Sequence, residues 1–254
     1  MAVTSPERDS HDPPLLPGWR AIGTAFRTLT ILGPGDRTAA RVDASAVYYP
    51  VVGMALGLIW VLADLAVGRI GGRLLGSAAV LSVGAALTRA RGPLALGRLL
   101  AALASRRPDR LTRLDGGGRR ATICALLVML VELAVLCELN RFRVVGLAFA
   151  PLLGCCAMVV LAVGSRAARP DGRRLKFAPE LGFAEFGAAS AATFALVSLS
   201  SEFLGLLMVL GTAIVTVAAR VFFHRWLDGV NDTAMFATGE IVQLMTLALL
   251  AAFS

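Results

Sequence analysis

The 254-residue chain alternates long apolar stretches with short polar ones from about residue 45 to its end. A helix that crosses a membrane needs roughly 20 apolar residues, because it pairs its backbone amides and carbonyls internally. The pattern predicts an all-α polytopic membrane helix bundle with about seven transmembrane helices, within a range of six to eight. The predicted spans are Val47–Val67, Leu74–Leu87, Ala121–Leu139, Val144–Val163, Phe183–Leu199, Leu204–Phe222 and Ile241–Phe253.

The composition is that of a membrane protein rather than a soluble one. Apolar residues make up 57% of the chain, charged residues only 17%, and the mean hydropathy is +0.73. Soluble domains are usually about a quarter charged. Apolar stretches leave no room for a separate soluble domain. We therefore expect a cytoplasmic N-terminal tail over residues 1–43 and a single transmembrane helical domain over residues 44–254.

The basic residues predict how the chain is oriented. Of the 25 Lys and Arg residues, 21 precede residue 44 or lie in the segments 88–120, 164–185 and 220–240. With seven spans these segments fall on one side, and cytoplasmic loops retain an excess of Lys and Arg. We expect a multi-pass protein of the bacterial cytoplasmic (inner) membrane with a cytoplasmic N-terminus. The net charge of +8 then indicates membrane lipid as a partner, and not nucleic acid.

Three acidic residues, Asp64, Glu132 and Glu138, fall within the predicted spans. Each is a candidate functional residue, because a charge in the hydrocarbon core is costly. For Glu138 the simpler interpretation is a side chain that reaches the interface from a helix end. A small transporter that uses Glu132 and Asp64 is one hypothesis, although no internal repeat supports it.

The first predicted span contains Gly53 and Gly57, which have the GxxxG spacing. Glycines at this spacing let two transmembrane helices approach closely. Small residues at such intervals are common in membrane helices. The pair therefore fits either a specific helix contact or an incidental spacing.

The segment most typical of a catalytic or metal-binding site precedes the last predicted span. It is HRWLDGVNDT at 224–233. Asp228 and Asp232 are four residues apart, which places both carboxylates on one face of a helix. Mg²⁺ binds such oxygens and can be completed by substrate phosphates, as in phosphoryl transfer. Glu240 is a candidate third ligand or base. The alternative is a turn between two helices in which Asp228 or Asp232 caps the last span.

Three stretches of the chain resemble the adenosylcobinamide-GDP ribazoletransferase (cobalamin synthase) family. The first is AFRTLT at 25–30 with YYPVVGMALG at 48–57, similar to the family's "FLTrlP" and "YfPlVGlliG". The second is APLLG at 150–154 with ARPDG at 168–172, similar to "AP.lgRwam" and "yARpeGlG". The third is DGVNDT at 228–233 with Glu240, similar to "GGvTGDtlGA..Eia".

The resemblance implies a magnesium-dependent transferase of the phosphotransferase class that acts in cobalamin biosynthesis. Such an enzyme joins alpha-ribazole, or its phosphate, to adenosylcobinamide-GDP and releases GMP. Asp232 and Glu240 match family residues and are the implied catalytic pair, while Asp228 and Asp232 are the implied Mg²⁺ ligands. Arg169 and Asp115 are implied to bind substrate. Implied partners are corrinoid and nucleotide substrates and other membrane enzymes of the cobalamin pathway.

The chain departs from this family where the family carries its first acidic motif. The corresponding region, residues 87–100, has no acidic residue and contains Arg89, Arg91 and Arg98. These cations would repel a metal ion. The family arginine after "AP.lg" is Cys155 here. The losses could impair the transferase, so a catalytically inactive relative that binds corrinoid or acts as a scaffold is the alternative.

Overall fold

A computed structural model describes residues 18–32, 45–106, 118–165 and 183–254. These residues form helices and no strands, which confirms the predicted all-α class. The elements in chain order are α1 (Gly18–Leu29), the 3₁₀ helix η1 (Ala46–Tyr48), α3 (Tyr49–Thr88), α4 (Arg91–Ala104), α6 (Gly118–Glu138), α7 (Arg143–Ala162), α8 (Phe183–Leu227) and α9 (Asp232–Ala252).

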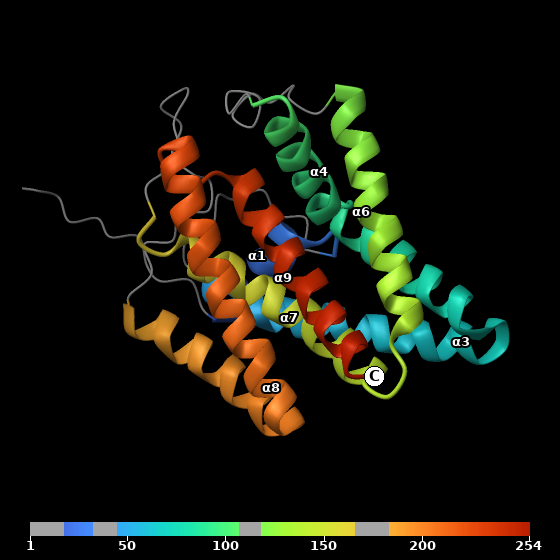
Figure 1. The fold of residues 1–254 in the computed structure, drawn as a ribbon. Helices are drawn as coiled ribbons and strands as arrows, with labels where there is room; N and C mark the ends of the chain where they lie inside the picture. Colours follow the sequence, from blue (N-terminus) through green and yellow to red (C-terminus); the bar gives the residue numbers. More distant parts are fainter. Residues whose placement is uncertain (1–17, 33–44, 107–117, 166–182) are drawn as a thin grey trace, which may run out of the picture.

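Helix α7 is the centre of the bundle, and α3, α8 and α9 pack around it (Figure 1). The most apolar 18-residue stretch of α7 is 78% buried, whereas the corresponding stretches of α3, α6 and α8 are only 22–28% buried. Their outer faces carry exposed leucines such as Leu62, Leu126 and Leu206. An apolar surface of this extent fits a hydrocarbon environment. The protein is a multi-pass membrane protein.

Helix α3 is a hairpin of two helical arms. It begins with Pro50 in its first turn, a position where the missing proline amide costs nothing, and it breaks at Gly72, whose φ of 76° and ψ of −177° are not helical. Beyond the break the arms return side by side. A Cβ atom on Gly76 would lie 3.0 Å from the Cα of Gly68, and one on Gly84 would lie 2.8 Å from Nε1 of Trp60.

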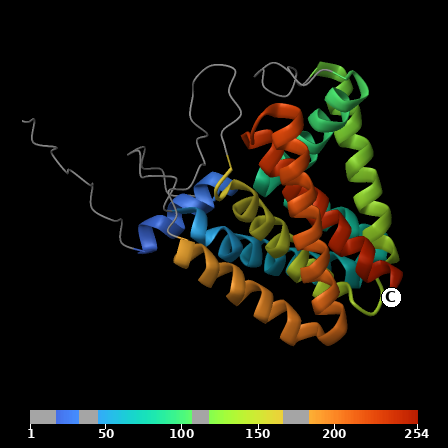
Figure 2. The ribbon, with the colours of Figure 1, turned by 60° about the vertical axis from the view of Figure 1, so that its left-hand side comes forward.

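Helix α8 also doubles back, as Figures 1 and 2 show in orange. At the bend a Cβ atom on Gly205 would collide with the backbone carbonyl of Val197. These two residues would be about 12 Å apart along a straight helix. The glycine therefore allows the two parts of α8 to meet.

The number of candidate spans is five among the described residues, two fewer than predicted. By length and apolar composition they are Ala46–Thr88, Gly118–Glu138, Arg143–Ala162, Phe203–Leu227 and Asp232–Ala252. The difference has a structural reason, because the predicted spans Val47–Val67 and Leu74–Leu87 are the two arms of α3. Phe183–Leu199 belongs to the first part of α8, where many side chains lie outside the described residues.

Helix α1 lies within the stretch assigned to the N-terminal tail. Ala21, Ala25 and Leu29 are four residues apart and buried, and they form the face through which α1 contacts α3. Arg27 is exposed on the other side. Packed structure thus begins before residue 44, while residues 1–17 and 33–44 lie outside the described part.

Gly53 and Gly57 make a specific contact with α7. A Cβ atom on Gly53 would lie 2.6 Å from the carbonyl oxygen of Pro151, and one on Gly57 would collide with the carbonyl of Ala148. Only glycine lets the two backbones approach this closely. The GxxxG spacing therefore marks the α3–α7 interface.

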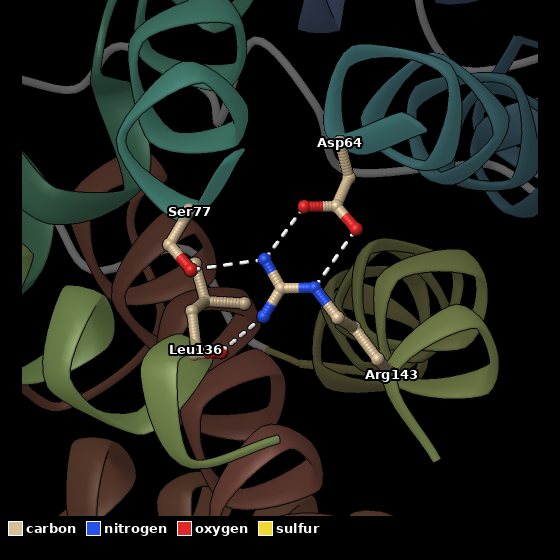
Figure 3. Close-up of polar contacts among 4 residues, drawn as sticks. All are labelled: Asp64, Ser77, Leu136 and Arg143. Atoms are coloured by element: carbon tan, nitrogen blue, oxygen red, sulfur yellow. Dashed lines mark hydrogen bonds and ion pairs between the residues drawn. The ribbon is translucent and has the colours of Figure 1, made fainter. Parts of the chain in front are cut away.

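Asp64 and Arg143 form an ion pair that joins α3 to α7 (Figure 3). Nε and Nη2 of Arg143 donate to the two carboxylate oxygens at 2.8 and 2.6 Å. The guanidinium also donates to Ser77 Oγ at 3.0 Å and to the carbonyl of Leu136 at 2.5 Å. Arg143 thereby links both arms of α3 with α6 and α7. Asp64 has a structural partner, which counts against the transporter hypothesis.

Replacing Gly57 by alanine should lower the free energy of unfolding by about 1–3 kcal/mol, because the new methyl group forces α3 away from α7. Thermal unfolding in detergent, followed by circular dichroism, measures the change. Gly187→Ala is the matched control, since a Cβ atom there meets nothing within 4 Å. Equal stability of the two variants would contradict the close contact.

Asp64→Asn should destabilise the protein by about 3 kcal/mol or more, because it leaves the mostly buried guanidinium of Arg143 without its anion. The double variant Asp64→Leu with Arg143→Leu should recover part of this loss, since it removes both charges. The same unfolding measurement applies. If the single variant is as stable as the original protein, the ion pair does not join these helices.

Candidate functional site

A pocket opens between helices α3, α4, α6, α7 and α9 and encloses about 730 Å³, the open space at its mouth included. Its walls are mainly apolar, from Leu56 and Trp60 of α3 to Met158 of α7 and Phe236 of α9. Its polar side chains are Arg91, Glu132, Glu240 and Gln243, with Thr88 and Cys155. A mostly apolar cavity with a few convergent polar groups is the usual form of a ligand site.

The crossing of α7 and α9 positions Glu240. Asn231 caps α9, and its side-chain oxygen accepts a hydrogen bond of 2.8 Å from the amide of Ala234. Gly154 and Gly239 face each other at the crossing, where a Cβ atom on Gly154 would lie 2.8 Å from the carbonyl oxygen of Gly239. The next residue, Glu240, is 6% exposed and lines the pocket.

The start of α4 lies against the Glu240 carboxylate. Arg89 and Ala90 both have positive φ angles, 57° and 50°, a region that non-glycine residues seldom occupy. This tight reversal turns the chain from α3 into α4 and brings Gly92 to the pocket. A Cβ atom on Gly92 would collide with Oε2 of Glu240, so glycine leaves the space that the carboxylate fills.

Glu132 of α6 is the second carboxylate of the pocket and is only 2% exposed. Its Oε1 accepts a hydrogen bond of 2.8 Å from Nε2 of Gln243, which lies about one turn after Glu240 on α9. Glu132 and Glu240 interact electrostatically. Oε1 of Glu240 is buried and has no hydrogen-bond partner among the described residues. The two glutamates thus form a neighbouring pair from different helices.

Arg91 is held beside this pair by three neighbours. It donates a hydrogen bond to the backbone carbonyl of Thr28, its guanidinium carbon lies 5.8 Å from the ring centre of Phe236, and it interacts electrostatically with Asp232. Burial, and secondarily the like charge of Arg89, lower the pKa of Arg91. Of the three arginines expected to repel a metal, Arg91 alone lines the pocket, and Arg98 is exposed.

The structure separates the acidic residues that sequence reasoning grouped together. Asp228 is exposed, with a φ of 56°, in the turn between α8 and α9. Asp232 is the first residue of α9. Glu240 lies eight residues further, about 12 Å along the helix axis, so its backbone is far from that of Asp232. The turn interpretation of 228–231 is confirmed, with Asn231 rather than an aspartate as the cap.

Asp115 and Arg169 lie outside the described residues, and their expected roles in substrate binding stay predictions. So do the catalytic roles of Asp232 and Glu240. Glu138 is exposed at the end of α6, as expected of a side chain that reaches the interface. Asp64 is not among the residues that line the pocket with Glu132.

The sequence pointed to Glu132 as a charge within a span but did not pair it with Glu240. These residues are 108 positions apart, and only the packing of α6 against α9 brings them together. No sequence pattern pointed to Gly92 as a residue of the site, because its role depends on the Glu240 carboxylate that the fold places beside it. The one available clue was the cost of burying the charge of Glu132, because the predicted last span began just after Glu240, at Ile241.

A magnesium ion has limited support from protein ligands here. In the described segments no group of three His, Cys, Asp or Glu side chains could hold a metal. Mg²⁺ needs only one or two carboxylates when substrate phosphates and water complete its shell. Glu132 and Glu240 meet that smaller requirement, and the unpartnered oxygen of Glu240 is available for it.

Comparison with known proteins identifies the family. The family model described as cobalamin-5-phosphate synthase matches residues 21–253. An adenosylcobinamide-GDP ribazoletransferase of Chlorobaculum tepidum is 28% identical over 229 residues, which are 87% of this chain and 90% of that protein. Another from Syntrophobacter fumaroxidans is 26% identical over 241 residues, 91% of this chain and 97% of that protein. No solved structure gives a significant match. Since the match spans nearly the whole bundle, pocket included, the chain belongs to the cobalamin-5-phosphate synthase family.

Proposed function

We propose that this protein is an adenosylcobinamide-GDP ribazoletransferase that joins alpha-ribazole, or its phosphate, to adenosylcobinamide-GDP and releases GMP. The observation that carries the proposal is the family match over residues 21–253, which includes every helix that lines the pocket. This makes nucleotide-loop assembly in cobalamin biosynthesis the function of the chain. The inactive corrinoid-binding or scaffold relative is the less favoured alternative.

In the proposed reaction, an oxygen of alpha-ribazole attacks the phosphorus next to the cobinamide, and the bond from that phosphorus to the GMP oxygen breaks. When the attacking group is a hydroxyl, its proton must leave, and an acidic side chain of α9, Asp232 or Glu240, accepts it. Positioning and neutralisation of the diphosphate supply most of the acceleration in such transfers. Arg91 contributes a positive charge at the pocket wall.

Mg²⁺ is part of this proposal as the cofactor that neutralises the diphosphate charge when it is bound. Glu132 and Glu240 are the acidic residues that line the pocket, and they would hold the ion; Oε1 of Glu240 has no hydrogen-bond partner among the described residues. The pocket lies where apolar helix faces meet the start of α4, which suits a substrate with a large corrinoid part and a charged nucleotide part. Those two parts make corrinoid and nucleotide substrates the proposed ligands.

We further propose that the protein lies in the bacterial inner membrane with its N-terminus in the cytoplasm. The excess of Arg in segments 88–120 and 164–185 supports this orientation. Nucleotide substrates are cytoplasmic, so the mouth of the pocket should face that side. Other membrane enzymes of the pathway are proposed partners.

Turnover tests the proposal directly. Purified protein with Mg²⁺, adenosylcobinamide-GDP and alpha-ribazole should form the cobalamin product and GMP, which chromatography detects. Glu240→Gln should reduce the rate at least 100-fold, because it removes a carboxylate from the pocket. Glu138→Gln, at the exposed end of α6, is the control and should keep full activity.

Failure to form product, while an intact family member does so under the same conditions, would overturn the transferase proposal. Corrinoid binding without turnover would then favour the inactive relative. Complementation of a strain that lacks its own cobalamin synthase gives an independent measurement.

Gly92→Ala should reduce the rate about 10-fold or more and leave thermal stability nearly unchanged. The new methyl group meets the far end of the flexible Glu240 side chain rather than backbone, so the carboxylate moves and the fold does not. Small displacements of a catalytic group have effects of this size. Unchanged kcat and KM in a stable variant would show that the position of Glu240 is unimportant.

A further inference from the structure

Trp60 is a hydrogen-bond donor of the pocket that has no acceptor. The residue is 5% exposed and lines the pocket from the first arm of α3. Its Nε1 is buried, and none of the described residues accepts the hydrogen of this nitrogen. A tryptophan N–H can only donate, and in protein interiors it usually has a partner. The unpaired donor therefore indicates that a ligand of the pocket supplies the acceptor.

The second arm of α3 places no side chain over this donor. Gly84 lines the same pocket, and a Cβ atom there would lie 2.8 Å from Nε1 and 2.9 Å from Cζ2 of Trp60. Any other residue at position 84 would press on the edge of the indole that carries the N–H. The carbonyl of Gly84 accepts a hydrogen bond of 2.8 Å from Oγ1 of Thr88, so it is engaged elsewhere.

The pocket has an apolar part at Trp60 and a polar part at the start of α4. One face of the second arm of α3 lines it with residues three or four positions apart, namely Leu81, Gly84, Ala85 and Thr88. This face is about 10 Å long. Trp60 packs on it at Gly84, whereas Arg91 and Glu240 lie beyond its end, at the start of α4. A ligand that fills both parts needs an apolar group with one acceptor, joined to a polar group.

We propose that the apolar part binds the benzimidazole base of alpha-ribazole, and that the Trp60 N–H donates to the ring nitrogen that does not carry the ribose. This nitrogen is the hydrogen-bond acceptor of the base. Met129 and Met158 line the pocket and supply adaptable contacts for an aromatic ring. The ribose then extends toward Arg91 and Glu240. Naming alpha-ribazole as the ligand rests on the proposed function, whereas the unpaired donor does not.

The size of the pocket favours alpha-ribazole over the corrinoid at Trp60. The pocket encloses about 730 Å³, the open space at its mouth included, which is within the range of sites that surround a drug-sized ligand. A nucleoside with a bicyclic base is of that size. The corrinoid ring with its side chains is several times larger and can lie only partly inside. Its amide groups also contain acceptors, so the experiment separates the two substrates.

The test measures binding of alpha-ribazole to the full chain in detergent, without corrinoid, by isothermal titration calorimetry. Trp60→Phe keeps an aromatic ring and removes the N–H, and it should weaken binding about 10-fold. The alpha-riboside of dimethylindole has a C–H in place of the ring nitrogen, and it should bind the original protein about 10-fold more weakly than alpha-ribazole does. Trp60→Phe should bind the two ribosides alike. A purely structural role of Trp60 would not remove this difference.

Trp226→Phe on α8 is the matched control, because Trp226 is not among the residues that line the pocket, and it should bind alpha-ribazole like the original protein. Circular dichroism confirms that each variant is folded. Equal binding of both ribosides by the original protein would overturn the proposal. So would a Trp60→Phe variant that raises the KM for adenosylcobinamide-GDP and leaves the KM for alpha-ribazole unchanged, since the donor would then bind the corrinoid.

Turnover decides the proposed function separately. Preferential binding of alpha-ribazole through Trp60 without product formation would keep the base site and reject the transferase. Product formation with the same KM for alpha-ribazole in the original protein and in Trp60→Phe would keep the transferase and reject the role of Trp60.

Discussion

A charged side chain within an apolar bundle has to be matched, because neither hydrocarbon nor packed side chains solvate it. Asp64 is matched by Arg143, which also bonds Ser77 and the carbonyl of Leu136. Buried hydroxyls follow the same rule by bonding the carbonyl four residues earlier in their own helix, as Thr212, Thr216, Thr238 and Thr246 do. Among the described residues Glu240 is one of the exceptions, since its buried Oε1 has no hydrogen-bond partner.

Close helix contacts at glycine residues determine where the buried acidic side chains lie. Gly53 and Gly57 allow α3 to approach α7, and Gly154 and Gly239 allow α7 to approach α9. These contacts place α3 and α9 against α7. The pocket lies beside α7, where α3, α4, α6 and α9 also contribute side chains. Glu240 enters this pocket because it follows Gly239 at the crossing. The same packing that stabilises the bundle thus positions the carboxylate.

The fold changes how the basic stretch at 87–100 is interpreted. As a sequence it replaces the acidic motif of the family with arginines, which argues against a metal there. In the structure only Arg91 enters the pocket, and Asp232 faces it. The carboxyl groups that line the pocket come instead from α6 and α9, as Glu132 and Glu240.

The sequence by itself determined the helical membrane fold, most of the helix positions and the family. Those properties follow from local runs of apolar residues and from motifs whose members are close along the chain. It also indicated Glu132, through the cost of burying a charge in a span, and Glu240, through its place after the acidic segment 224–233 and the family motif. Their pairing, the hairpin form of α3 and the place of Arg91 were decided only by tertiary structure, because each depends on which helix faces contact each other. The apolar faces of membrane helices are nearly alike, so the sequence alone does not show which helices pack together. Close contacts at glycines and buried polar partners select the neighbours in the folded protein.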